Sequence, residues 1–245
     1  MKGVILAGGL ATRLRPLTFV TNKHLLPIYN KPMIFYPLES MVRAGIKDVL
    51  IIIGPGHAGS FLNLLKSGKY FGLNLSYEIQ EEARGIAQGI SLAESFSDGK
   101  KLLVILGDNI FDYDLKDTVE NFEKKEKGAM VFGVEMPTGS KQYGVIEIGK
   151  GGKVISIEEK PEYPKSNIAQ TGIYMYDDRV FKFIKKLSPS KRGELEVTDL
   201  NNAYVKEGTM EYEIINWWID AGTSHDELLR ANNLVADKIK HGELK

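Results

Sequence analysis

Four short runs of consecutive apolar residues constrain the fold of this 245-residue chain more than any other feature. They are KGVILA (2–7), DVLIII (48–53), LLVIL (102–106) and AMVFGV (129–134). Runs that are short and apolar without alternation are typical of strands buried on both faces of a parallel sheet. Helical patterns separate them at the spacing of βαβ units. The sequence therefore predicts an α/β fold with a Rossmann-like, doubly wound, mainly parallel sheet.

The segments between these runs carry the predicted helices, at 33–44, 60–67, 86–96 and 115–127. Gly45, Gly68 and Gly128 follow three of them, and a glycine just past the last turn is the usual helix stop. LSYEIQ (75–80) is a further strand candidate.

The second half of the chain indicates an inserted antiparallel portion. Residues 143–161 contain two strand patterns joined by glycines at 149–152, which is a hairpin signal, and 167–177 is another strand candidate. Helical patterns cover 178–187, 197–207 and 223–240, the last with Ser224 and Glu227 placed as a capping box. Without a repeat or a Pro-rich linker, residues 1–245 are expected to form one domain, in which the antiparallel portion covers the ligand edge of the sheet.

Composition excludes several classes of function. Lys+Arg and Asp+Glu are both 32, so nothing suggests a basic surface for nucleic acid or membrane lipids. There are no cysteines, and the four histidines lie far apart, which argues against disulfides, thiol nucleophiles and zinc. The chain opens on a strand pattern without a leader, and no apolar stretch approaches the ~20 residues of a membrane span. The expectation is a soluble, cytoplasmic protein.

The loop after the first strand is the first candidate site. Gly8 and Gly9 allow close approach of a ligand to the backbone, and Arg13 and Arg15 follow them. By itself the stretch fits a phosphate-binding loop and a solvated surface turn equally well. It is neither a dinucleotide fingerprint nor a Walker loop. Lys23 is a second candidate for phosphate charge, although a lone lysine is more often solvated.

Two aspartates are candidates for holding a metal ion. Asp108 directly follows the buried run 102–106, and Asp220 in IDAGT precedes the last helix. Carboxylates in such places suit Mg²⁺ beside substrate phosphates. A turn or helix-capping role explains each of them as well.

Further polar groups end other elements. EEKP (158–161) and RGELEVTD (192–199) are charge runs, which in isolation are most often solvated. Gln80 ends a strand, and its side-chain amide offers the donor and acceptor that match the imide edge of a pyrimidine.

Taken together, these stretches resemble the sugar-1-phosphate nucleotidyltransferase family in order and spacing from about residue 2 to residue 235. The resemblance rests on LAGGLATRLRPLT (6–18), NKHLLP (22–27), QEEARGIAQ (80–88), LGDN (106–109), YGV (143–145), EEKP (158–161), TGIYMYD (171–177), RGELEVTD (192–199) and WWIDAGT (217–223). It is strongest to members that transfer a deoxythymidylyl group to glucose 1-phosphate. It implies dTTP and glucose 1-phosphate as substrates, dTDP-glucose and pyrophosphate as products, Mg²⁺ as cofactor, and a homo-oligomer (dimer or tetramer).

Alternatives remain within and outside this class. A UTP-dependent or other sugar-1-phosphate nucleotidyltransferase shares most of the pocket residues. A catalytically silent relative that binds a nucleotide sugar as a regulatory subunit is more remote, because the charged residues named above are all present. The resemblance also divides the chain into a nucleotide-binding half (about 1–135), a sugar-binding portion (about 136–222) and the helix at 223–240.

The resemblance also implies a role for each matching residue. The implied catalytic residues are Arg13, Lys23 and Asp108. The implied nucleotide-binding residues are Leu6, Gly8, Gly9, Thr12, Arg13, Gln80 and Gly85. The implied sugar-phosphate-binding residues are Asn109, Gly144, Glu159, Lys160, Gln170, Tyr174 and Arg192. The implied metal ligands are Asp108 and Asp220. A phosphate nucleophile is already ionised at neutral pH, so the absence of a candidate catalytic histidine fits this chemistry.

Three features depart from the family pattern. Ala11 stands where glycine is usual, so its φ should be negative or the loop mildly strained. Gln170 stands where close relatives carry a small apolar residue, which leaves the sugar open. The chain ends soon after the helix at 223–240, whereas longer bacterial members continue into a helical extension; we expect weakened or altered feedback inhibition.

Overall fold

A computed structural model describes residues 1–244. Its parallel block is formed by β6 (Leu102–Leu106), β1 (Lys2–Ala7), β4 (Asp48–Ile53) and β5 (Asn74–Ile79), adjacent in that order. Val4, for example, faces Leu50 on one side and Val104 on the other. The continuous apolar runs are buried here as predicted, so the Rossmann-like, doubly wound part of the fold is confirmed.

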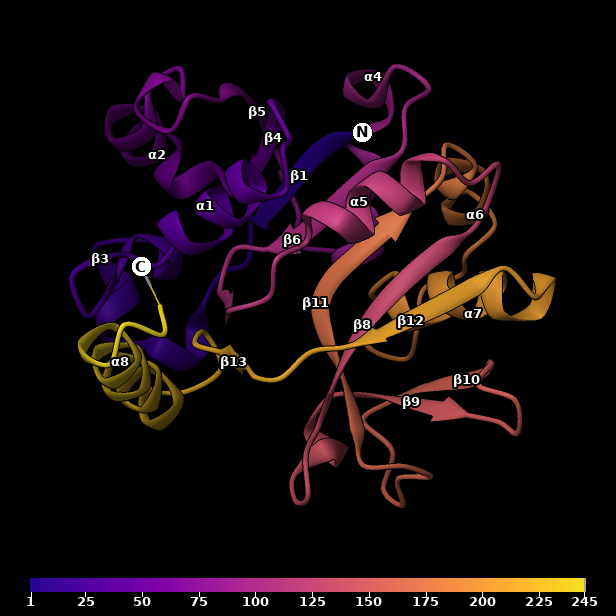
Figure 1. Cartoon of the computed structure of the whole chain (residues 1–245). Coiled ribbons are helices and arrows are strands. Elements are labelled where there is room, and N and C mark those ends of the chain that lie inside the picture. The colour runs from indigo at the N-terminus through magenta and orange to yellow at the C-terminus, as the bar shows by residue number, and fades with distance from the viewer. Residues whose placement is uncertain (245) are drawn as a thin grey trace.

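The antiparallel portion continues the same nine-stranded sheet, in the order β10–β9–β11–β6, with β8 beside β11 and β12 beside β8. Its strands are β8 (Ala129–Glu135), β9 (Gly144–Ile148), β10 (Val154–Glu159), β11 (Ile168–Tyr176) and β12 (Met210–Ile214). The predicted hairpin is β9–β10. In Figure 1 the hairpin lies at the far end of the molecule from β1.

The fourth apolar run, β8, lies outside the parallel block. Its place beside β6 is taken by β11, which runs antiparallel to β6, and β8 pairs antiparallel with β11 and parallel with β12. Burial on both faces makes a strand continuously apolar whatever the direction of its neighbours, so the pattern predicted the strand but not its partners.

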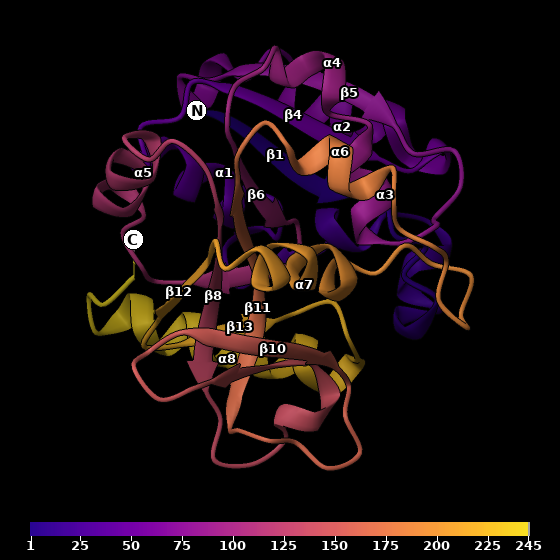
Figure 2. The same cartoon turned by 90° about the vertical axis from the view of Figure 1, so that its right-hand side faces the viewer.

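Helices cover both faces of the sheet (Figure 1 and Figure 2). One face packs on α1 (Phe35–Arg43), α2 (Ala58–Leu65) and α5 (Lys116–Glu123), and the other on α3 (Ile86–Ser91), α6 (Val180–Ile184) and α7 (Val197–Glu207). The remaining helices are α4 (Glu94–Ser97) and α8 (His225–Lys240). The predicted helix 86–96 is thus two helices, because Leu92 and Ala93 bond to carbonyls three residues back, those of Gly89 and Ile90, and interrupt the α-helical pattern.

A separate small core joins α8 to two short sheets. One sheet pairs β7 (Asn109–Phe111) with β13 (Trp218–Asp220), and the other pairs β2 (Pro27–Ile28) with β3 (Lys31–Pro32). Ser224 caps α8 by accepting from the Glu227 backbone N–H at 3.1 Å, as the capping pattern predicted. Among residues 1–244, no helix is long and apolar enough to cross a bilayer.

Candidate functional site

Two adjoining cavities open where β1 and β6 end. The larger has a volume of about 530 Å³ and reaches from the loop after β1 to the β9–β10 hairpin. The smaller, of about 260 Å³, lies toward β5 and α3. Gly9, Lys23 and Asp108 line both, so the cavities meet at these residues. The carboxyl ends of parallel strands are the usual ligand edge of an α/β sheet.

The structure brings together nearly all the candidate residues from the sequence. Those on the larger cavity are Gly9, Thr12, Arg13, Lys23, Asp108, Asn109, Gly144, Glu159, Lys160, Gln170, Tyr174 and Asp220. Those on the smaller one are Leu6, Gly8, Gly9, Lys23, Gln80, Gly85 and Asp108. Arg192 is on the lining of neither cavity: its guanidinium donates to Glu196 at 2.8 Å and lies 3.8 Å from Glu159.

The loop after β1 combines close packing with strain. A Cβ on Gly8 would lie 2.3 Å from the Gln80 Oε1, so a larger residue here would displace the Gln80 amide. Ala11 has φ 50° and ψ 37°, in the left-handed region that favours glycine. For an L-residue that conformation costs about 1–2 kcal/mol, which is the strain expected for alanine at this position.

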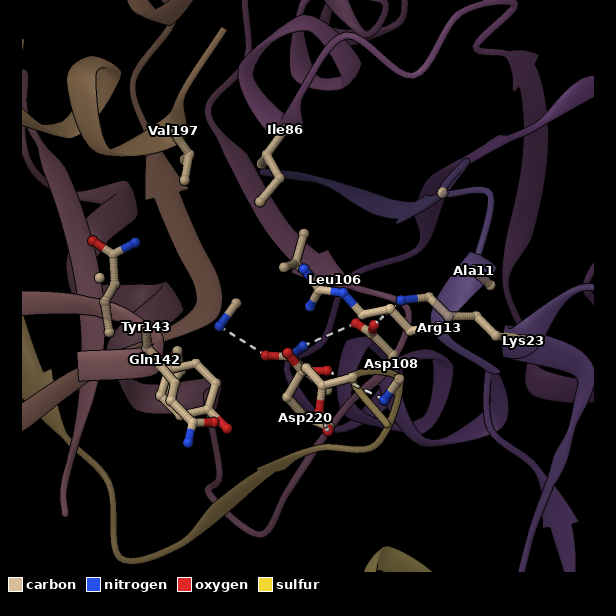
Figure 3. A pocket seen from close by; sticks show the side chains of 18 of the residues that line it. Ala11, Arg13, Lys23, Ile86, Leu106, Asp108, Gln142, Tyr143, Val197 and Asp220 are labelled. Atoms are coloured by element: carbon tan, nitrogen blue, oxygen red, sulfur yellow. Dashed lines mark hydrogen bonds and ion pairs between the residues drawn. The ribbon is translucent and has the colours of Figure 1, made fainter. Parts of the chain in front are cut away.

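Charge is concentrated in the middle of the larger cavity, where Figure 3 shows Arg13 and Lys23 beside Asp108 and Asp220. The Lys23 ammonium donates to Asp108 Oδ2. Burial alone would lower the pKa of Lys23, but the two carboxylates outweigh it and raise that pKa. Burial likewise opposes ionisation of Asp108, yet Lys23 holds the pKa of that carboxyl below its usual range.

Asp220 differs from Asp108. Burial and the neighbouring Asp108 charge raise the pKa of Asp220 to about 8. Gly222 makes this crowding possible, since a Cβ there would lie 2.3 Å from Asp108 Oδ2 and 2.6 Å from Lys23 Nζ. Two carboxylates held this close favour a cation between them.

These two carboxylates fit a divalent cation that takes its remaining ligands from elsewhere. Within residues 1–244 there is no cluster of three or more His, Cys, Asp or Glu side chains able to hold a metal. Mg²⁺ commonly binds through one or two carboxylates, with water and substrate phosphates completing its oxygen shell. The site is therefore suited to a metal that arrives with a phosphate ligand.

Asn109 joins three segments at the floor of the cavity. Its Oδ1 accepts from the Gly172 backbone N–H at 2.7 Å and from Trp218 Nε1 at 2.5 Å. Its Nδ2 donates to Asp108 Oδ1 at 3.1 Å. Asn109 thereby ties β7 to β11 and β13 and orients Asp108.

The smaller cavity is built around the Gln80 amide. Gln80 Nε2 donates to Gln88 Oε1 at 2.6 Å, and its Oε1 faces the Gly8 backbone. His24 also lines this cavity; burial and Lys23 lower its pKa to about 3, so its imidazole is uncharged at neutral pH. The sequence offered no signal for Gln88, because one glutamine on a helix is usually a solvated residue.

The far end of the larger cavity is formed by neighbouring strands. Glu159 on β10 faces Gly144 on β9, and a Cβ on Gly144 would lie 3.4 Å from Gln170 Cβ on β11. Thr198 on α7 donates to Glu159 Oε2 at 2.8 Å. Lys160 has φ 47°, a strained conformation of the kind found at ligand sites.

Sequence reasoning missed the apolar walls of the cavity. Tyr143 packs edge-on against Trp218 with ring centroids 5.0 Å apart, and Ile86, Leu106 and Val197 line the opposite parts. Burial raises the pKa of Tyr143 to about 12, so its hydroxyl keeps its proton. Such residues are indistinguishable from core residues in a sequence.

Comparison with known proteins agrees with this architecture. The profile of the nucleotidyl transferase family matches residues 2–238. A glucose-1-phosphate thymidylyltransferase of Neisseria meningitidis is 42% identical over 239 residues, covering 96% of this chain and 82% of the relative.

Two solved structures share the fold. A Bacillus anthracis protein in complex with a sucrose, provisionally assigned as a glucose-1-phosphate thymidylyltransferase, superposes with a TM-score of 0.91 at 47% identity, covering 97% of this chain and 96% of the other. A UDP-glucose pyrophosphorylase complexed with UDP-glucose gives 0.82 at 25% identity, covering 97% and 98%. The family match spans nearly all of the chain described here, which belongs to the nucleotidyl transferase family.

Proposed function

We propose that this protein is a glucose-1-phosphate thymidylyltransferase, which converts dTTP and glucose 1-phosphate into dTDP-glucose and pyrophosphate. The observation that carries the proposal is the junction of the two cavities at Lys23 and Asp108, with Asp220 beside them on the larger cavity. An amide-bearing pocket for a base lies on one side of that junction, and a polar pocket for a sugar on the other. The relatives that bear this name are 40–44% identical over most of the chain, which supports the same assignment.

The reaction needs charge neutralisation more than proton transfer. A phosphate oxygen of the sugar phosphate attacks the α-phosphorus of the nucleotide, a new P–O bond forms, and the bond to the β-phosphate oxygen breaks as pyrophosphate leaves. The nucleophile is already an anion, so no general base is required. The obstacle is repulsion between anions, and fixed cations lower it.

Two cations of this chain are suited to that task. Arg13, on the exposed loop after β1, would hold the departing pyrophosphate through its planar fork of donors. Lys23 lies at the junction of the cavities, where the α-phosphate would sit. An incoming phosphate competes with Asp108 for the Lys23 ammonium.

Asp108 and Asp220 are proposed to hold Mg²⁺. When bound there, the ion supplies further positive charge to the phosphates. Asn109 keeps Asp108 in place through its side-chain amide.

The substrates are proposed to lie at opposite ends of the paired cavities. Leu6, Gly8, Gly9, Thr12, Gln80 and Gly85 are proposed to hold the nucleotide. Asn109, Gly144, Glu159, Lys160, Gln170, Tyr174 and Arg192 are proposed to hold the sugar phosphate. To bind the sugar phosphate, the Arg192 guanidinium would have to leave Glu196. Breaking a partly exposed ion pair costs little free energy.

The test is pyrophosphate release from the purified protein with Mg²⁺, measured for dTTP, UTP, ATP and GTP against glucose 1-phosphate and its epimers. The highest kcat/KM is expected for dTTP with glucose 1-phosphate. UTP as the better nucleotide would reassign the protein to the uridylyl-transferring class, to which the UDP-glucose pyrophosphorylase neighbour belongs by name. No turnover with any pair would reject the enzymatic proposal. The homo-oligomer and the cytoplasmic location stay predictions.

A further inference from the structure

Behind the sugar end of the larger cavity, buried hydrogen bonds link Gln170 to Asn201 and Tyr176, two residues to which no substrate contact has been assigned. Tyr176 OH donates to Asn201 Oδ1 at 2.7 Å, and Asn201 Nδ2 donates to Gln170 Oε1 at 3.1 Å. Gln170 Nε2 lies 3.5 Å from the Tyr174 hydroxyl. All four side chains are nearly or fully inaccessible to solvent, and Asn201 is completely so.

The order of donors and acceptors along these hydrogen bonds starts at Tyr176. Tyr176 OH donates to Asn201 Oδ1, and burial raises the pKa of Tyr176 well above its ordinary value, so its hydroxyl keeps the proton for this bond. With its oxygen accepting from Tyr176, Asn201 directs its NH2 group at Gln170 Oε1. Gln170 in turn must accept through Oε1, which leaves its NH2 group facing the Tyr174 hydroxyl and the cavity.

The fold provides a rigid mount for this arrangement. Gln170 precedes an irregular stretch of β11, where the pairing with β8 shifts between Gln170 and Tyr174. Gly144 on β9 lies beside Gln170: a Cβ there would be 3.5 Å from Gln170 Nε2, an ordinary van der Waals distance. Thr198 and Asn201 are three residues apart on α7, hence on one face of the helix, and they hold Glu159 and Gln170 respectively.

We propose that Asn201 is a positioning residue for sugar recognition: held by Tyr176, it fixes the Gln170 amide so that an N–H donor points at a sugar hydroxyl oxygen. The inference rests on the proposed function, because it assumes that the sugar phosphate occupies this end of the cavity. Neither Asn201 nor Tyr176 touches the substrate. They act by preventing Gln170 from rotating and presenting its acceptor instead.

The first experiment measures kcat and KM for both substrates in Asn201→Ala, Gln170→Ala and the double variant. Asn201→Ala is expected to raise KM for glucose 1-phosphate about 5- to 10-fold, the size of one hydrogen bond, with KM for dTTP and kcat within twofold of wild type. Gln170→Ala is expected to do the same. The double variant is expected to be no worse than Gln170→Ala, because Asn201 acts only through Gln170.

The matched control is Asn202→Ala on the same helix. Asn202 Nδ2 donates to the Ile157 carbonyl at 2.6 Å, so it binds β10 without contacting Gln170. This variant is expected to lose stability and leave KM for glucose 1-phosphate unchanged.

Tyr176→Phe is the milder second variant, for the case that Asn201→Ala does not fold. It keeps the ring but removes the proton that orients Asn201, and a rise of about 2- to 5-fold in the same KM is expected. A panel of deoxyglucose 1-phosphates gives a further readout. One deoxy sugar is expected to have a higher KM than glucose 1-phosphate in wild type. That difference in KM is expected to disappear in both Gln170→Ala and Asn201→Ala.

The outcomes separate this inference from the proposed function. A wild-type protein without turnover rejects both. An active wild type overturns the positioning role alone if Asn201→Ala and Tyr176→Phe leave the sugar KM unchanged, if the nucleotide KM rises equally, or if the effects of Asn201→Ala and Gln170→Ala multiply in the double variant.

Discussion

The two ends of the active cavity are built in opposite ways. At the proposed nucleotide end, Gly9, Leu10, Thr12 and Arg13 are exposed, on a loop whose turn passes through the strained Ala11. At the proposed sugar end, Gln170 and Tyr174 are buried and held by residues that are themselves buried. Phosphates are attracted by charge, which acts over distance and tolerates loop movement, whereas a hydroxyl is selected by directional hydrogen bonds. An exposed loop therefore suits the phosphates, and buried hydrogen-bonded side chains suit the sugar hydroxyls.

The carboxylates between the two ends should give the largest effects. Asp108→Asn and Asp220→Asn each keep the shape but remove a charge from the proposed metal site. Turnover is expected to fall on the order of 10³-fold, with a higher Mg²⁺ concentration needed for half-maximal rate. Initial rates over a Mg²⁺ titration measure both.

The double variant distinguishes a shared ion from two separate roles. Losses smaller than the product of the single losses are expected, since both carboxylates serve one ion. Asp112→Asn, an exposed aspartate on the chain just beyond β7, is the control and should match wild type. If Asp220→Asn had wild-type activity, Asp220 would have only the structural role of accepting from the Gly222 backbone N–H.

Removing one cation from the nucleotide end should have the next largest effect. Arg13→Ala and Lys23→Ala are each expected to lower kcat/KM for dTTP on the order of 10²-fold, because each loses a charge aimed at the phosphates. Arg15→Ala is the matched control: its guanidinium lies over the Phe19 ring at 5.3 Å and does not line the cavity, so steady-state kinetics should barely change. Near-wild-type turnover in Lys23→Ala with saturating Mg²⁺ would remove Lys23 from the mechanism.

Substitutions at Gln80 and Gln88 test whether one side chain also orients another through a hydrogen bond at the nucleotide end. Gln80→Ala is expected to reduce the preference for dTTP over ATP about tenfold, and Gln88→Ala by somewhat less, because Gln88 orients the Gln80 amide. The ratio of the two kcat/KM values is the measurement. Gln142→Ala, on the larger cavity only, should leave that ratio unchanged. An unchanged ratio in Gln80→Ala would show that the base is read elsewhere.

The strain at Ala11 should give the smallest effect. Ala11→Gly is expected to raise the free energy of unfolding by up to about 1 kcal/mol, since glycine adopts a positive φ without penalty. Thermal unfolding should shift upward by about 2–4 °C. Ala203→Gly, inside α7, is the opposite control and should destabilise by about 0.5–1 kcal/mol. A destabilised Ala11→Gly would mean that the loop does not carry this strain.

Sequence patterns predicted the strands better than their partners. Runs of consecutive apolar residues identified β1, β4, β6 and β8. The place of β11 between β6 and β8 depends on long-range pairing, which these runs do not contain. The strand β12, MEYEI, alternates apolar and charged residues and was missed although period-two alternation is the usual signal. The three-residue strands β7 and β13 are too short to leave a pattern.

The same limit applies to the site. Charged residues at strand ends were found, because charge at such an edge is unusual and the family resemblance joined them. Asn201 and Gln88 lie within helices, where an amide is ordinary in a sequence. Their importance depends on what folds against them, which no local pattern contains. Arg192 shows the converse, since a matching motif residue points to Glu196 rather than into the cavity.

The place of β11 has a consequence for the modularity of this enzyme class. Its first residues pair with β8 and β9, and its last ones, from Ile173 onward, pair with β6. The proposed sugar end and the proposed nucleotide end thus share one continuous strand. A chimaera that grafts residues 136–222 from another family member would replace a strand in the middle of the recipient's sheet. New sugar preferences are therefore better sought by substitutions on an intact framework than by exchange of cassettes.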